Sequence, residues 1–162
     1  MQQTTDISEA TYRARLEKVQ EEMKEFGLQA IILEPGPAMT YLTGVHWGKS
    51  ERTFAVVIPV KGAVGWVLPG FEEMRARELI HAGDDIRVWQ EDESPYARIT
   101  EILKDRGVVS GRVGMDDGMR FFVFDGVRRL APKLDYSSAT QALKAAGVDL
   151  TPAARGGRGK QD

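Results

Sequence analysis

The sequence contains no cysteine and only two histidines. The absence of thiols excludes disulfides, thiolate metal sites and cysteine nucleophiles, and it is compatible with a reducing compartment. His46 and His81 fall in different predicted elements. Because a catalytic zinc or manganese site normally needs three or more convergent ligands, we expect this chain to build no metal or cofactor site by itself.

Long apolar runs and a strong charge of one sign are also missing. Nowhere do about 18 uncharged apolar residues follow one another, and Met1 to Asp6 have neither the basic start nor the apolar run of a signal peptide. The net charge of -2 argues against a nucleic-acid surface covering the whole chain. We therefore expect a soluble, cytoplasmic protein that binds no membrane and for which nucleic acid is an unfavoured partner.

Enough apolar residues are present for one packed domain, since 42% of the 162 residues are apolar and 28% are charged. One helical face is formed by Tyr12, Leu16, Val19, Met23 and Phe26, which recur at steps of four and three. This spacing predicts an amphipathic helix that ends at Gly27.

The start of that helix and the segment after it also carry signals. Asp6 with Glu9 resembles a capping box. Leu28 to Leu33 is continuously apolar, which predicts a strand covered on both faces. Thr53 to Val60 and Ala63 to Leu68 flank Lys61-Gly62, a two-residue connection typical of a tight hairpin.

The rest of the chain alternates between helical and extended patterns. A helix is expected around Phe71, Met74, Leu79 and Ile80, and the segments that follow are predicted as a strand at 85–90, a helix at 94–107, a strand at 112–115, a helix at 121–130 and a strand at 134–136. This order predicts an α/β fold over residues 6–140, with three layers (α/β/α) and a mixed sheet of about six strands including one hairpin. Residues 141–162 are expected to form a weakly helical to disordered tail, because the final segment lacks apolar anchors.

The segment between the first two predicted strands, Glu34 to Arg52, is where we expect function. Pro35, Gly36 and Pro37 end the strand. The next residues predict a short helix closed by a left-handed Gly44. A polar and aromatic loop with His46, Trp47 and Arg52 follows.

Other polar clusters are interpreted as structural. Asp116-Asp117-Gly118 invites a metal or phosphate interpretation, but a strand-to-helix turn whose aspartates cap the next helix is favoured. Glu91-Asp92-Glu93 is predicted to be a solvated loop, and Ser137-Ser138 has no histidine or lysine at a readable spacing. His81 is interpreted as a surface residue at a helix end. Residues 155–160 resemble RNA-binding tails rich in arginine and glycine, although an unstructured terminus is preferred.

Several motifs occur in a familiar order. Tyr41-Leu42-Thr43-Gly44 follows an extended segment and precedes Arg52, a strand ending in Pro59, a strand ending in Leu68-Pro69, and Val113-Gly114-Met115-Asp116. From about Ser8 to Thr140 the chain resembles the N-terminal domain of the creatinase and Xaa-Pro dipeptidase (prolidase) or aminopeptidase family. In that family a larger catalytic domain follows and binds two divalent metals, often manganese, cobalt or zinc, through ligands that have no counterpart here. The resemblance thus implies a domain without catalytic activity of its own.

The resemblance also implies partners and a role for the loop. The family's domain mediates dimer or tetramer contacts, so a second copy or a full-length peptidase subunit is the expected partner. Its loop after the Tyr41 to Gly44 motif can reach a neighbouring active site, where Arg52 would contact a substrate carboxylate and His46 and Trp47 would line the approach. An ion pair of Arg52 with Glu34 or Glu51 remains the structural alternative, and Tyr41 is interpreted as packing. A free-standing peptide- or protein-binding module that uses residues 34–52 is the alternative function.

Overall fold

The computed structural model describes residues 7–152 and has the expected alternation of helices and strands. The helices are α1 (Glu9–Phe26), α2 (Pro37–Thr43), α3 (Glu73–Leu79), α4 (Pro95–Asp105), α5 (Phe121–Leu130) and α6 (Thr140–Ala145). The strands are β1 (Leu28–Leu33), β2 (Ala55–Pro59), β3 (Gly65–Pro69), β4 (Asp85–Trp89), β5 (Arg112–Met115) and β6 (Asp135–Ser138), and a 3-10 turn, η2 (Gly70–Glu72), precedes α3. None of the helices described is long and apolar enough to span a membrane.

The six strands form one mixed sheet in the order β4-β3-β2-β1-β5-β6. Strand β2 is antiparallel to both of its neighbours, whereas β3 pairs in parallel with β4, and β1, β5 and β6 pair in parallel. Five strands therefore point the same way, and their carboxyl ends meet at one edge of the sheet. The predicted three-layer α/β fold is confirmed.

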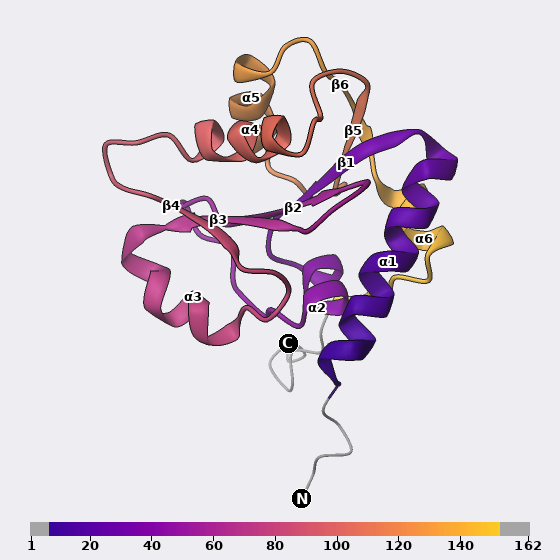
Figure 1. Ribbon diagram of the computed structural model, residues 1–162. Coiled ribbons are helices and arrows are strands. Elements are labelled where there is room, and N and C mark those ends of the chain that lie inside the picture. The colour runs from indigo at the N-terminus through magenta and orange to yellow at the C-terminus, as the bar shows by residue number, and fades with distance from the viewer. Residues whose placement is uncertain (1–6, 153–162) are drawn as a thin grey trace, which may run out of the picture.

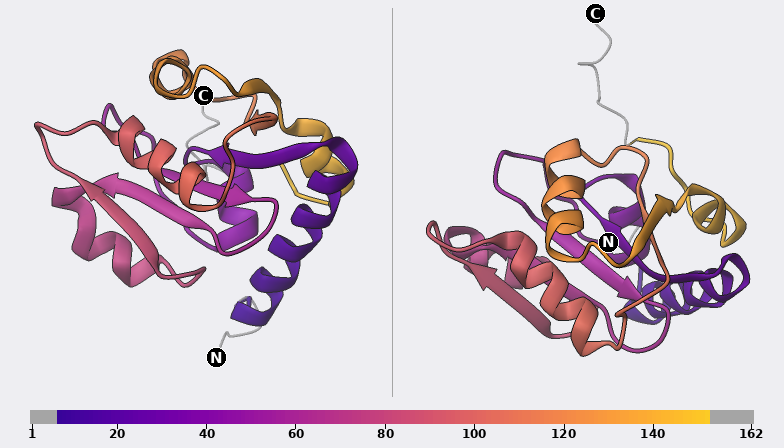
Figure 2. Two further views of the ribbon diagram at one scale, coloured as in Figure 1. Left: turned by 45° about the horizontal axis from the view of Figure 1, so that its top comes forward. Right: turned by 90° about the horizontal axis from the view of Figure 1, so that it is seen from above.

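Helices cover both faces of the sheet (Figures 1 and 2). Helices α1, α2, α3 and α6 lie on one face, and α4 and α5 lie on the other. One apolar cluster packs under α1 and α2 around Met23, Leu42 and Trp66. The second packs under α4 around Ile99 and Ile102. Strand β1 contributes to both clusters, which explains its continuous apolar sequence.

Two local predictions fail at turns and caps. Helix α1 is capped by Ser8, whose Oγ accepts the Thr11 amide at 3.2 Å, while Asp6 lies outside the described residues. Strands β2 and β3 do form the antiparallel hairpin, but their connection spans residues 60–64 rather than Lys61-Gly62 alone. Pro59 has no amide to extend the ladder, and the Val60 amide donates to the Gln29 carbonyl oxygen at 2.9 Å.

The helix predicted around Phe71 is present and Ile80 is buried as predicted, but Phe71 and Met74 do not lie on the buried side. Phe71 lies in η2 and is 75% exposed, and Met74 is 81% exposed. The residues of this region that are buried are Ala76 and Ile80. Two large apolar side chains are therefore left in contact with solvent beside the carboxyl end of β3.

The segment after residue 140 packs more tightly than a weakly helical tail. Helix α6 contacts α1, and its Ala142 and Leu143 are buried, as are Ala146 and Val148 beyond it. These four residues pack together because their spacing places them on one side of α6 and of the residues that follow it. Residues 153–162, with the basic tail, lie outside the described part.

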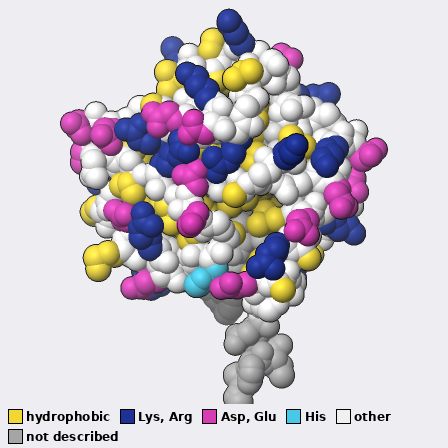
Figure 3. All heavy atoms as spheres, in the orientation of Figure 1, with side chains coloured by type: hydrophobic (Ala, Val, Ile, Leu, Met, Phe, Trp, Pro, Cys, Tyr) yellow, Lys and Arg dark blue, Asp and Glu magenta, His cyan; other side chains and the backbone are white. Residues whose placement is uncertain are grey.

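Charges of both signs are interspersed on the surface. Figure 3 shows Lys and Arg side chains alternating with Asp and Glu over one face, with apolar side chains between them. This distribution agrees with the small net charge of the chain.

Candidate functional site

The predicted functional loop lies at the edge where the parallel strands end. Glu34 follows β1, Glu91 lies beyond β4, and Asp116 follows β5, while the loop of residues 44–52 leads into β2 at the same edge. In open α/β sheets, ligands bind outside the carboxyl ends of the parallel strands. The sheet therefore places this loop where a binding site is expected.

The loop begins at a glycine that no other residue can replace without strain. Gly44 closes α2 with φ of 81°, and its amide donates to the Thr40 carbonyl oxygen at 2.9 Å. A Cβ at this position would lie 2.9 Å from the Tyr12 ring. The predicted left-handed closure is confirmed, and the tight contact with α1 adds a second reason for glycine.

The preceding motif residues hold α2 in place. Leu42 is buried, and the Thr43 Oγ1 donates to the Met39 carbonyl oxygen at 2.7 Å and accepts the Val45 amide. The Arg15 guanidinium lies 3.8 Å from the centre of the Tyr41 ring and donates to the Tyr41 carbonyl oxygen at 2.7 Å. Tyr41 thus occupies a packing position against α1.

Trp47 and His46 lie differently in the loop. Trp47 stacks on Phe54 with ring centroids 4.6 Å apart, and Phe54 packs edge-on against the buried Trp66. His46 is exposed to solvent. The indole therefore ties the loop to the core beneath it, while the imidazole is accessible.

Arg52 reaches across to the neighbouring loops rather than to Glu34 or Glu51. Its Nη1 donates to Glu91 Oε2 at 2.6 Å, and its Cζ lies 4.6 Å from the centre of the Phe71 ring. The hydrogen bond and charge of Glu91 raise the pKa of Arg52. Arg52 thus forms an ion pair, but the predicted partners, Glu34 and Glu51, are wrong. Glu91 belongs to the predicted solvated loop, and its side chain is 78% exposed.

Glu34 instead binds an arginine that the sequence analysis missed. The Arg120 guanidinium donates to Glu34 Oε1 from Nε at 3.0 Å and from Nη2 at 2.6 Å, and the Arg120 amide donates to Oε2 at 2.9 Å. Glu34 is completely buried, and Arg120 Nη1 also donates to the Ser50 carbonyl oxygen at 2.7 Å. Arg120 thus joins β1, the start of α5 and the functional loop.

The Glu34–Arg120 ion pair lies at the carboxyl end of β1, where the connections of the sheet change direction. The chain leaves β1 towards β2 on one side and later returns through α4 to β5 on the other side of β1. A glutamate directly after a buried strand was a usable signal for a polar contact here, because such a position lies at the carboxyl edge. Its partner could not be identified from spacing alone.

The aspartates after β5 do not cap α5. Asp116 Oδ1 accepts the Gly118 amide at 3.3 Å, and Asp117 Oδ1 accepts the Ser138 hydroxyl at 2.5 Å. Helix α5 begins at Phe121, and Arg120 before it makes no side-chain capping hydrogen bond. The predicted capping role is wrong because residues 118–120 separate the aspartates from the first turn, so they close their own turn and bind β6 instead.

Among residues 7–152, no group of three or more His, Asp or Glu side chains converges as a metal site would require. His81 lies 3.5 Å from Glu9 through Nδ1, and its side chain is 60% exposed. It therefore occupies a surface position beyond the end of α3.

Comparison with known proteins identifies the family. The family model described as the Creatinase/Prolidase N-terminal domain matches residues 15–146. The chain belongs to this family. The match contains the motif of α2, the loop of residues 44–52, and both partners of the Glu34–Arg120 pair.

Relatives of this creatinase/prolidase N-terminal domain include both longer proteins and isolated domains. An uncharacterized peptidase of Schizosaccharomyces pombe is 30% identical over 136 residues, which cover 75% of this chain and 29% of that protein. The crystal structure of a dipeptidase from Pyrococcus horikoshii is 26% identical with a TM-score of 0.71, and the match covers 81% of this chain and 35% of that one. The isolated domain of an X-Pro dipeptidase from Streptococcus pyogenes is 18% identical with a TM-score of 0.69, and the match covers 82% and 98% of the two chains.

The covered fractions show which part of the longer relatives this chain matches. The chain spans about a third or less of the peptidase and dipeptidase chains that it matches, and it corresponds to nearly the whole of the isolated domain. The resemblance noted in the sequence is thus confirmed at the level of domain and fold.

Proposed function

We propose that this chain is the non-catalytic N-terminal part of an Xaa-Pro dipeptidase- or aminopeptidase-type metallopeptidase, acting in the cytoplasm through subunit contacts and substrate access. The family match over residues 15–146 carries the proposal. Catalysis would come from a second domain that binds two divalent metals such as manganese, cobalt or zinc. A second copy or a full-length peptidase subunit would be the partner.

In this proposal Arg52 binds the carboxylate of a peptide substrate in a neighbouring subunit. A guanidinium matches a carboxylate with two parallel hydrogen bonds. The present partner of Arg52 is the 78% exposed side chain of Glu91, and such exposed pairs contribute little stability. A substrate carboxylate therefore can take the place of Glu91 at small cost.

The surroundings of Arg52 support such a role. Arg120 fixes the Ser50 carbonyl oxygen, and Lys49 Nζ donates to the Gly118 carbonyl oxygen at 3.2 Å, so the residues before Arg52 are held from two sides. A fixed loop loses less entropy when it binds a ligand. His46 and Trp47 would line the same approach.

A chimera in which residues 7–148 replace the equivalent domain of a related dipeptidase tests this role. Arg52→Ala should raise the KM for an Xaa-Pro dipeptide about tenfold, the loss of one charged hydrogen-bonded contact. The KM for the corresponding dipeptide amide should change much less. Arg75→Ala is the matched control, because Arg75 on α3 is 68% exposed and only weakly paired with Glu78 at 3.7 Å. Equal effects on the acid and the amide would contradict carboxylate recognition.

The absence of catalysis is tested on the purified chain itself. Incubation with manganese or cobalt and an Xaa-Pro dipeptide should give no turnover above the rate with metal alone. Metal-dependent turnover that copurifies with the chain would contradict the non-catalytic assignment.

The second candidate function is a free-standing peptide- or protein-binding module that uses residues 34–52. The 75% exposed ring of Phe71 beside Arg52 favours it, because exposed aromatic and arginine side chains are typical of binding hot spots. A pull-down with the Arg52→Ala and Phe71→Ala variants as controls separates the two functions. Recovery of a full-length peptidase supports the first, and recovery of an unrelated partner that is lost in both variants supports the second.

A further inference from the structure

A groove of about 330 Å³ lies at the carboxyl ends of β5 and β6, next to the first turns of α5. Its apolar wall consists of Met115, Met119, Phe121, Phe124 and Tyr136. Phe124 packs edge-on against Tyr136 with ring centroids 5.6 Å apart, and the Phe121 ring lies 6.0 Å from Phe124. The volume is in the range of small-ligand or side-chain sites.

This wall is more apolar and more exposed than folding alone requires. Phe121 is 70% exposed and the neighbouring Phe122 is 44% exposed, although α5 buries Val123 and Val127 against the sheet. Exposed apolar patches of this kind mark interaction sites. The two methionines are flexible and polarizable, so they adapt to side chains of different shape.

The rim of the groove is negatively charged. Asp116 and Asp117 line it, and each accepts a hydrogen bond from a neutral donor, the Gly118 amide and the Ser138 hydroxyl. Hydrogen bonds from Ser138 and Thr140, with a smaller contribution from the charge of Lys144, keep the pKa of Asp117 below its ordinary value, so this carboxylate is ionised at neutral pH. Lys49 lies beside the turn but donates to the Gly118 carbonyl oxygen rather than to a carboxylate.

We propose that this groove binds a peptide segment in which an apolar side chain is followed by a lysine or arginine. The apolar side chain packs against Phe121, Phe124 and Tyr136, and the cation lies between the rim carboxylates and the faces of these rings. The negative rim and the aromatic wall together select this chemistry over an acidic or wholly apolar partner. The proposal is independent of the role of Arg52, because it uses a different set of side chains.

Titration of the labelled full chain with N-acetyl-Phe-Lys-amide, followed by heteronuclear NMR, tests the proposal. Backbone amide shifts should concentrate at residues 115–121 and 136–138 and saturate at millimolar peptide. N-acetyl-Phe-Glu-amide and N-acetyl-Gly-Lys-amide should bind at least about fivefold more weakly, since each lacks one of the two contacts.

Variants separate the two halves of the site. Phe121→Ala should weaken binding about fivefold by removing the wall. Asp116→Asn should weaken it about threefold while keeping the acceptor for the Gly118 amide. Met74→Ala is the control, since this methionine is 81% exposed but lies in α3, and it should leave the affinity unchanged.

Several outcomes would overturn the proposal. These are an absence of shifts at the groove at millimolar peptide, equal binding of the acidic peptide, or an equal loss of affinity in Met74→Ala. Shifts of the same residues on concentrating the chain alone would assign the groove to a second copy instead. Because Phe121 and Asp116 lie at the surface, unchanged spectra elsewhere in each variant verify that the fold is retained.

Discussion

Arg120 and Glu34 lie 86 residues apart in the sequence and form a 2.6 Å ion pair at the centre of the carboxyl edge of the sheet. The carboxylate is completely buried and accepts three hydrogen bonds, all from Arg120. Burying a charge is costly unless it is paired and hydrogen-bonded, and here a single arginine fulfils both conditions. The same arginine holds the loop that carries Arg52.

Replacement of Arg120 is expected to be strongly destabilising. Arg120→Ala leaves the buried Glu34 carboxylate without a cation, which costs about 3 kcal/mol of unfolding free energy. Urea unfolding followed by tryptophan fluorescence measures the loss. Arg129→Ala on the same helix, where the arginine side chain is 71% exposed, should leave the midpoint almost unchanged. The double variant Glu34→Leu with Arg120→Met should recover most of the loss, and a failure to do so would contradict the role of the unpaired charge.

Gly44→Ala should destabilise the protein more than the same change at Gly147. Both glycines have φ near +80°, so alanine is strained at either position by roughly 1 kcal/mol. At Gly44 the new Cβ would also meet the Tyr12 ring at 2.9 Å, whereas at Gly147 nothing lies within 4 Å. The difference between the two unfolding free energies measures the clash. Equal losses of unfolding free energy at Gly44 and Gly147 would show that α1 moves away from the new Cβ without cost.

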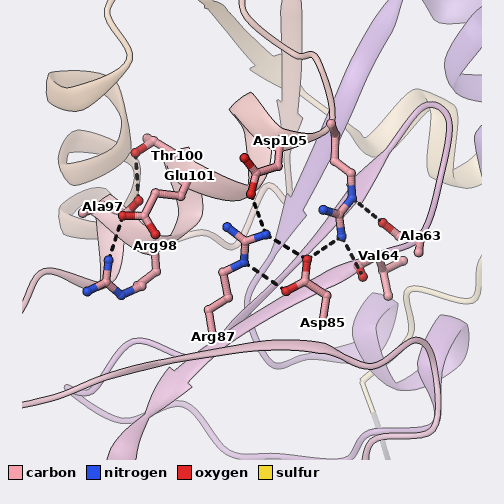
Figure 4. A network of polar contacts seen from close by, with 10 residues as sticks. Ala63, Val64, Asp85, Arg87, Ala97, Arg98, Thr100, Glu101 and Asp105 are labelled. Carbon is pink, nitrogen blue, oxygen red and sulfur yellow. Dashed lines mark hydrogen bonds and ion pairs between the residues drawn. The ribbon is translucent and has the colours of Figure 1, made fainter.

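The contribution of Asp85 on the edge strand β4 to stability should be lost at acidic pH. Asp85 accepts hydrogen bonds from Arg87 at 3.0 Å and from Arg106 at 2.8 Å (Figure 4). The hydrogen bond from Arg87, helped by Arg106, lowers the pKa of Asp85 from its ordinary value of 3.8. The ionised form is therefore favoured in the folded state, so its contribution is complete above pH 3.8 and is lost as the pH falls towards the lowered pKa.

Asp85→Asn tests this dependence. At neutral pH the variant should be less stable by about 1 kcal/mol, because it loses the charge but keeps one acceptor. The difference from the unmodified chain should shrink as the pH falls below 3.8. Asp84→Asn is the control, because it removes the same charge from an exposed side chain next to Asp85. A difference that stays constant with pH would contradict the ion-pair explanation.

Arg52→Ala should leave the fold intact. The salt bridge to Glu91 lies at the surface, where ion pairs contribute little. The urea midpoint of this variant should therefore match that of Glu91→Gln and of the unmodified chain. A large shift would instead assign Arg52 a structural role and weaken the case for substrate contact.

Local patterns in the sequence predicted most of the elements correctly. Tyr12, Leu16, Val19 and Met23 gave the helix that becomes α1, and the prolines after Leu33 gave the end of β1. Such signals depend on neighbouring residues, which share one turn or one strand. The cap of α1 and the connection between β2 and β3 are also set by neighbouring residues, but several residues in each segment can take the same role. The predictions of Asp6 as the cap and of Lys61-Gly62 as the whole connection therefore failed.

The candidate site was only partly predictable for a related reason. The loop after Gly44 was found because proline, glycine and aromatic residues interrupt two apolar strands. The partners of its side chains come from elsewhere: Glu91 for Arg52, Phe54 for Trp47, and Arg120 for the Ser50 carbonyl oxygen. No pattern within the loop identifies them.

The sequence by itself determined the alternation of helices and strands, the family, and the position of the loop with Arg52, because periodicity, turn residues and short motifs act over a few neighbours. Only the tertiary structure decided that Glu34 binds Arg120, that Arg52 binds Glu91, and that Phe121 and Asp116 line one groove. Those pairings depend on the order of strands in the sheet, which brings the carboxyl ends of distant segments to a common edge.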